Sequence, residues 1–138
     1  MTHRPFIMAV ALASTAVTTA APAFASPAPI LAPADRYFGH LQMSILGVRN
    51  SLRDLRRQVE AHPDSAARIY EETVLVEDSL HDWAKKFPGD PWLPQFLYSL
   101  AELYRTIDTE DARVRKNDTL DWLIASYPTS DYAKMARI

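Results

Sequence analysis

Phe87-Pro88-Gly89-Asp90-Pro91-Trp92 separates two long amphipathic stretches and marks the end of one helix and the start of the next. Pro88 and Gly89 disfavour a continuing helix, whereas a proline in the first turn of a new helix loses no hydrogen bond. Two similar junctions occur, His62-Pro63-Asp64-Ser65 and Tyr127-Pro128-Thr129-Ser130. In each, a ring residue precedes a proline and a polar residue that can cap a helix. The recurrence predicts helical hairpins packed in series.

Two helices are predicted before the central junction. The first extends from about Ala34 to His62, because Pro63 disfavours helical geometry in the residue before it. Its apolar residues recur at steps of three and four, as on one face of a helix. They are Leu41, Ile45, Val48, Leu52, Leu55 and Val59. The second helix begins after Asp64 or Ser65, either of which can cap it, and ends at Phe87.

Three helices are predicted after that junction. The third, from Trp92 to Ile107, is apolar over more than half of its surface and should therefore lie at the centre of the domain. Asp108 or Thr109 caps a fourth helix that ends near Tyr127, and a short fifth begins near Ser130. No stretch alternates with a period of two between hairpin turns, so no sheet is expected. The fold class is all-α, with about five helices in antiparallel hairpins.

The first 25 residues differ from the rest of the chain. Arg4 precedes an apolar run from Phe6 to Val17, and Ala23-Phe24-Ala25 supplies the small residues of a cleavage site. This layout is typical of a secretory signal peptide cut after Ala25. Hydroxyl residues interrupt the run too early for a membrane-spanning helix, so the mature form should have no transmembrane anchor. Residues 26–33 then form a tether rich in proline and alanine, and residues 34–138 one helical domain.

Composition limits the classes of partner. The chain has 15 basic and 17 acidic residues, and removal of Arg4 with the signal changes the formal net charge from −2 to −3. This balance does not favour nucleic acid, whose binding needs clustered lysine and arginine. The arginines at positions 49, 53, 56 and 57 are interpreted as a solvated helix surface, with an anion site as the alternative. With no cysteine in the chain, packing alone must hold the fold.

Catalysis and metal binding have little support in the sequence. A structural or catalytic metal site needs three or four ligands, and the best cluster is His81 with Glu77 and Asp78 at helical spacing. There is no cysteine nucleophile, no Gly-x-Ser-x-Gly turn and no glycine-rich phosphate loop. We therefore expect no enzyme and no cofactor. The alternative is a small periplasmic enzyme or metal-binding or ligand-binding bundle that uses His81, Glu77 and Asp78.

The first predicted helix carries the candidate binding residues. Gly39, Met43 and Gly47 are spaced by four, so they would share one stripe on that helix. Glycine inside a helix costs about 1 kcal/mol relative to alanine, and such a cost usually has a packing reason. One interpretation is a close approach of a neighbouring helix. The other is a shallow groove in which a partner docks beside Tyr37, Phe38 and His40.

The junctions resemble those of tetratricopeptide repeat proteins of the bacterial envelope, over about residues 90–137. Leu100, Leu103 and Ile107 match first-helix core positions of a 34-residue repeat, Leu120 and Leu123 match second-helix positions, and Pro128 matches the closing proline. Tyr104 and Lys116 depart from the small residues that the family has there. The resemblance implies a right-handed stack of hairpins that binds peptides or proteins on a concave face. An irregular helical bundle is the structural alternative.

These observations lead to one functional hypothesis. The chain is expected to be an exported protein, periplasmic or secreted, that binds a protein or peptide partner in the cell envelope and has no catalytic activity. A homodimer formed through the first helix is a further possibility, because its near-heptad apolar face could pair with a copy of itself.

Overall fold

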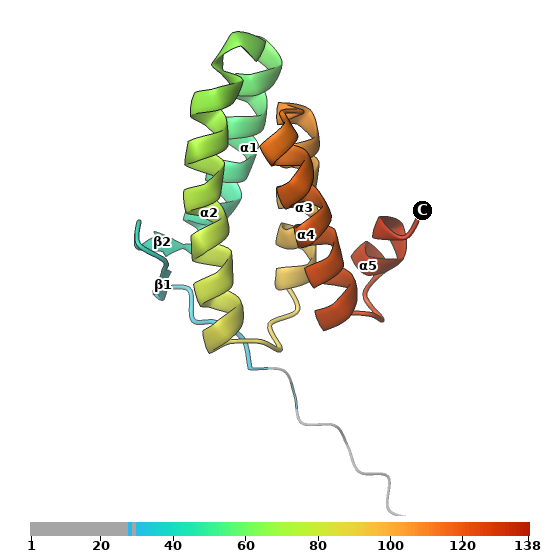
Figure 1. Cartoon of the computed structure of the whole chain (residues 1–138). Coiled ribbons are helices and arrows are strands. Elements are labelled where there is room, and N and C mark those ends of the chain that lie inside the picture. The colour runs from blue at the N-terminus through green and yellow to red at the C-terminus, as the bar shows by residue number, and fades with distance from the viewer. Residues whose placement is uncertain (1–27, 29) are drawn as a thin grey trace, which may run out of the picture.

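The computed structural model describes Ala28 and residues 30 to 138, so the expected signal peptide lies outside the described residues. The described part is mostly helical, which confirms the all-α class (Figure 1). Its elements are β1 (Tyr37–Phe38), β2 (Met43–Ser44), α1 (Ile45–Ala61), a 3₁₀ turn (Pro63–Ser65), α2 (Ala66–Lys86), α3 (Leu93–Ile107), α4 (Glu110–Ser126) and α5 (Asp131–Ala136). No helix within it is both long and apolar enough to cross a membrane.

The starts of α4 and α5 follow the expected capping chemistry, whereas the expected side-chain cap of α2 is not formed. The Thr109 hydroxyl accepts a hydrogen bond from the Ala112 N–H at 3.3 Å and begins α4. The Ser130 hydroxyl does the same for α5, with the Ala133 N–H at 3.1 Å. Each satisfies a backbone donor that has no partner within its helix. Ser65 makes no such hydrogen bond, because the 3₁₀ turn leads directly into α2.

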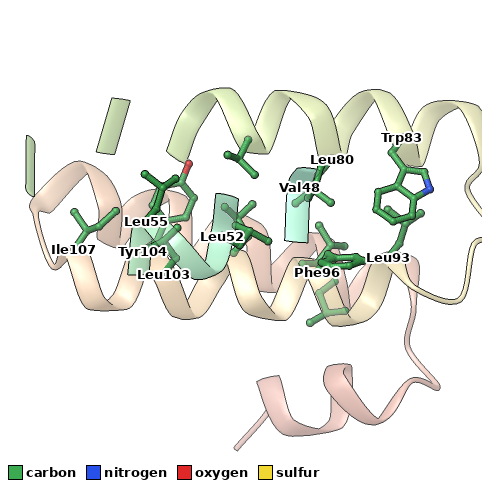
Figure 2. Packing of buried hydrophobic residues seen from close by; sticks show 14 of the residues in the cluster. Val48, Leu52, Leu55, Leu80, Trp83, Leu93, Phe96, Leu103, Tyr104 and Ile107 are labelled. Atoms are coloured by element: carbon green, nitrogen blue, oxygen red, sulfur yellow. The ribbon is translucent and has the colours of Figure 1, made fainter. Parts of the chain in front are cut away.

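Helix α3 lies at the centre of the domain, as predicted from its wide apolar surface. It packs against α1, α2, α4 and α5. Figure 2 shows Leu80 and Trp83 of α2 directed toward Leu93 and Phe96 at the beginning of α3. All four are buried, and Val48, Leu52 and Leu55 of α1 belong to the same cluster. The domain therefore has one continuous apolar core.

Asp90 connects three parts of the chain at the α2–α3 junction. Its carboxylate is buried and accepts hydrogen bonds from the N–H groups of Ala32 (2.9 Å) and Trp92 (3.0 Å), and from the Trp83 indole (3.1 Å). A buried carboxylate is tolerated only where such donors surround it. Ala32 is itself buried, so Asp90 fastens the segment before the first helix to the core.

The prediction of no sheet is wrong for residues 37–44. Tyr37 pairs with Ser44 and Phe38 with Met43 in a short antiparallel hairpin. The first helix consequently begins at Ile45, where the Ser44 hydroxyl accepts from the Gly47 N–H at 3.0 Å, and not near Ala34. Two-residue strands are too short to show a period-two pattern, and contacts with α2 hold them in place.

Three large apolar residues within the predicted helices are exposed. Leu41 lies in the hairpin turn and is exposed. Trp92 precedes α3, and Val114 lies on α4, and both are about half exposed. Trp92 lines a surface pocket together with residues of α1 and α3.

Candidate functional site

A groove runs between α1 and α3. It consists of two adjoining pockets with volumes of about 390 and 370 Å³. Arg49 of α1 and Gln95 and Phe96 of α3 line both pockets, so the groove is continuous. Helix α1 forms one wall of the groove. The buried face of α1 packs on α3, and the residues at the edge of that face remain accessible.

One end of the groove is apolar. Leu31, Leu46 and Trp92 line the first pocket, and between 54% and 55% of each residue is exposed. Leu31 belongs to the segment that the adjacent Ala32 anchors on Asp90. The three residues thus come from distant parts of the sequence and form one half-exposed apolar surface. Such a surface loses contact with water when a partner covers it.

The other end is basic. Arg49, Arg53 and Arg56 line the second pocket from α1, where steps of four and three place them on one edge of the helix. Glu102 of α3 is the acidic residue among the residues lining this pocket, and it pairs with Arg105 at 2.6 Å. The groove therefore changes from apolar to positively charged along α1.

The predicted binding residues do not form a helical stripe. Gly39 lies in the turn of the hairpin and Met43 in β2, so neither shares a face of α1 with Gly47. A side chain at Gly47 would meet only Ser44 and Met43, so no neighbouring helix approaches there. Both interpretations assumed a helix that starts before Ile45.

The remaining candidates lie in the same hairpin. Phe38 is fully buried and stacks on Trp83, with ring centroids 5.6 Å apart, so its ring belongs to the core and not to a surface. Tyr37 and His40 are exposed. The hairpin brings Tyr37, Gly39 and His40 beside α2 and does not place them in the α1–α3 groove.

Two aspartates of α2 hold the hairpin turn. The His40 N–H donates to Asp78 at 2.8 Å, and the Gly39 N–H donates to Asp82 at 2.9 Å. Hydrogen bonds from the His40 backbone and imidazole hold the pKa of Asp78 below its usual range. Lys86 and the Gly39 N–H lower the pKa of Asp82 in the same way. Both carboxylates thus act as acceptors that fasten the hairpin.

Replacing Gly39 with alanine should release the hairpin from α2. Its φ of +69° is the left-handed conformation, which costs other residues about 1 to 2 kcal/mol. An added Cβ would lie 2.7 Å from the Ser79 Cα, so the backbones must separate. We expect lower stability in denaturant and faster hydrogen exchange at the amides of residues 39 and 40. Gly89→Ala is the control, because no atom lies within 4 Å of a Cβ there. Equal effects of the two substitutions would contradict this packing.

The residues of the alternative site are divided between two places. Asp78 bonds to His40 on the hairpin side, whereas His81 Nε2 lies 3.5 Å from Glu77 Oε1 and its ring stacks on Trp122 of α4. Residues 28 and 30–138 contain no group of three or more histidine or acidic side chains that could hold a metal. His81, Glu77 and Asp78 therefore do not converge on a common ligand position.

Glu77 instead links α2 to α3 and α4. Its Oε2 accepts from the Tyr104 hydroxyl at 2.5 Å and from Arg115 Nη1 at 2.9 Å. Burial opposes ionisation of Glu77, but hydrogen bonds from His81, Tyr104 and Arg115 outweigh it and lower its pKa. Burial and the neighbouring carboxylate raise the pKa of Tyr104. With these partners the Glu77 carboxylate joins α2 to α3 and α4.

Sequence reasoning identified the arginines of α1 but not the groove that they line. Their spacing placed them on one face of a helix, and that pattern does not tell which neighbour the face borders. Leu31, Leu46 and Gln95 belong to no motif, and the junction that contains Trp92 indicates only where a helix begins. These residues come together through the packing of α1 on α3 and the anchoring of Ala32 on Asp90.

Comparison of the chain with protein-family models, with curated proteins and with solved structures gave no match.

Proposed function

We propose that this chain is an exported binding or adaptor module that holds a protein partner in the α1–α3 groove and catalyses no reaction. The observation that carries the proposal is the continuity of the groove from an apolar end to a basic end. Aromatic residues and arginine are enriched where proteins bind one another. Trp92 and the arginines of α1 supply these residue types along one surface.

The packing of the helices supports a tetratricopeptide-like stack as the scaffold. Helix α3 contacts both helices of the preceding pair, α1 and α2, and α5 contacts both α3 and α4. Stacking of successive hairpins requires such contacts between each new helix and the pair before it. In this scheme α1, α3 and α5 border one side of the molecule, where the groove lies.

Export is supported by residues 1–25, which have the basic start, apolar run and small-residue cleavage site of a signal peptide. The proposal therefore places the partner in the cell envelope or outside the cell. A periplasmic partner would meet the groove after the signal has been removed.

Position-specific photocrosslinking in the native envelope tests this function. A photoreactive amino acid is placed at Gln95, which lines both pockets, and at Ala125, which is exposed on α4 outside them. We expect a discrete covalent adduct with another protein from position 95 and none from position 125. Mass spectrometry of the adduct then identifies the partner.

Two outcomes would contradict the proposal. Adducts of equal yield from positions 95 and 125 would mean that the groove is not the preferred contact surface. No protein adduct from position 95, in cells where the tagged protein is exported and folded, would mean that the groove holds no protein partner.

A further inference from the structure

We propose that the groove recognises an acidic segment of the partner that carries one large apolar side chain close to its carboxylates. The apolar side chain would enter the pocket bordered by Leu46 and Trp92, and the carboxylates would pair with the arginines of α1. This inference rests on the proposed function and specifies the chemistry of the partner.

The charge of the groove lining selects an acidic occupant. The lining of the groove includes three arginines, Arg49, Arg53 and Arg56, and one acidic residue, Glu102, whereas the whole chain carries a formal net charge of −2. The groove is thus a basic site on a slightly acidic protein. Opposite charges across an interface favour the correct partner and repel basic segments.

The arginines are available for a partner. Arg53 and Arg56 pair with Asp54 (3.2 Å) and Glu60 (3.0 Å), which are about half exposed and are not among the residues that line the two pockets. Exposed ion pairs of this kind are each worth only about 0 to 1 kcal/mol, so a partner's carboxylate can replace them. Arg49 forms no ion pair with any residue that the structure describes.

The apolar end supplies a place for an anchor. The pocket there has a volume of about 390 Å³, and Leu31, Leu46 and Trp92 border it with roughly half of their surfaces exposed. Protein ligands commonly fix themselves by one aromatic or aliphatic side chain in such a pocket. Arg49 and Gln95 line this pocket too, so polar partners stand beside the anchor position.

The spacing of these features suits one short segment. Leu46 and Arg56 are ten residues apart on α1, which corresponds to about 15 Å at about 1.5 Å per residue. An extended peptide covers that distance in about five residues at roughly 3.3 Å per residue. The anchor and the carboxylates are therefore expected within about six residues of one another.

Two other occupants fit the surface less well. A symmetric pair of identical grooves would bring the two arginine rows into one interface, where like charges repel. An anionic bilayer would attract the arginines, but its flat surface does not fill a recess between two helices. The observations therefore favour a peptide segment over a second copy or a membrane.

Fluorescence anisotropy with synthetic peptides tests the inference on the purified protein. The probes are labelled twelve-residue peptides with one phenylalanine and three glutamates spaced by serine, with the phenylalanine before or after the glutamates. Matched peptides carry lysine in place of glutamate. We expect at least one glutamate peptide to bind about tenfold or more tightly than its lysine counterpart, and to weaken as salt rises.

Two triple variants locate the binding site. The groove variant combines Arg49→Glu, Arg53→Glu and Arg56→Glu. The control reverses three exposed arginines that are not among the lining residues of the groove, and so changes the net charge by the same amount. It combines Arg57→Glu, Arg68→Glu and Arg113→Glu. With both variants folded by circular dichroism, the groove variant should lose about tenfold or more in affinity and the control much less.

Several results would overturn the inference. These are equal binding of glutamate and lysine peptides, no binding of any glutamate peptide, or equal losses in the two triple variants. Phosphatidylglycerol vesicles that bind through the same arginines, while no peptide does, would identify a membrane surface as the occupant.

A photoadduct from position 95 that persists in the groove variant would overturn the acidic partner but leave the proposed function standing. Absence of that adduct in the unmodified protein would remove the proposed function itself.

Discussion

Replacing Trp83 with alanine is expected to destabilise the protein by about 3 to 5 kcal/mol. The indole is fully buried, stacks on Phe38 and packs against Phe96 with ring centroids 5.4 Å apart. Its removal leaves a cavity between α2, α3 and the hairpin and also deletes a donor to Asp90. Chemical denaturation followed by far-UV circular dichroism measures the change.

Trp92→Ala is the matched control for that substitution. Trp92 is about half exposed and lies at the edge of the groove, so its loss should cost about 1 kcal/mol or less. Equal unfolding midpoints for Trp83→Ala and the unmodified protein would show that Trp83 is not a core residue. A larger loss for Trp92→Ala than for Trp83→Ala would contradict the arrangement at the α2–α3 junction.

Asp90→Ala is expected to have the second-largest effect on stability. Its carboxylate accepts three N–H groups, and removing an acceptor from a buried donor costs about 1 to 3 kcal/mol for each donor left without a partner. Because the donors share one site and can relax together, we expect a total loss of about 3 kcal/mol. The amide of Ala32 should also exchange its hydrogen faster.

Two further substitutions check the cause of that loss. Asp90→Asn keeps one carbonyl oxygen as an acceptor. The free energy of unfolding of this variant should therefore lie between that of the unmodified protein and that of Asp90→Ala. Asp121→Ala removes a carboxylate from the exposed face of α4 and should change the unfolding free energy by less than about 0.5 kcal/mol. Protection of the Ala32 amide that is unchanged in Asp90→Ala would contradict the role of Asp90 as the anchor of that segment.

The helical part of the fold could be predicted because its signals are local. The proline junctions after His62, Phe87 and Tyr127 end α1, α2 and α4. Thr109 caps the start of α4, and Ser130 caps the start of α5. The apolar width of the third predicted helix correctly placed α3 at the centre. These signals depend on a few neighbouring residues and on one periodicity.

The hairpin could not be predicted in the same way. Residues 34–44 contain apolar residues at spacings compatible with a helix, and only tertiary contacts overrule that pattern. Gly39 adopts a positive φ and lies against Ser79, while Asp78 and Asp82 accept the turn amides. The predicted binding stripe is absent for the same reason. Gly39 lies in the hairpin and Gly47 in α1, so the two glycines do not share a helix face.

The groove could not be predicted from local sequence patterns either. The arginines of α1 look like an ordinary solvated surface until α3 is placed beside them. Leu31 reaches the groove only because Asp90, nearly 60 residues later, fixes the adjacent Ala32. A surface built from three separate segments leaves no single motif in the sequence.

Chemical-shift mapping of the ¹⁵N-labelled protein, titrated with the glutamate peptide, tests most directly whether the α1–α3 groove is the binding surface. We expect shifts that saturate together at the amides of Leu46, Arg49, Gln95 and Ser99, with little change at His81. Shifts concentrated around His81 on α2, or in the hairpin turn at His40, would contradict that expectation.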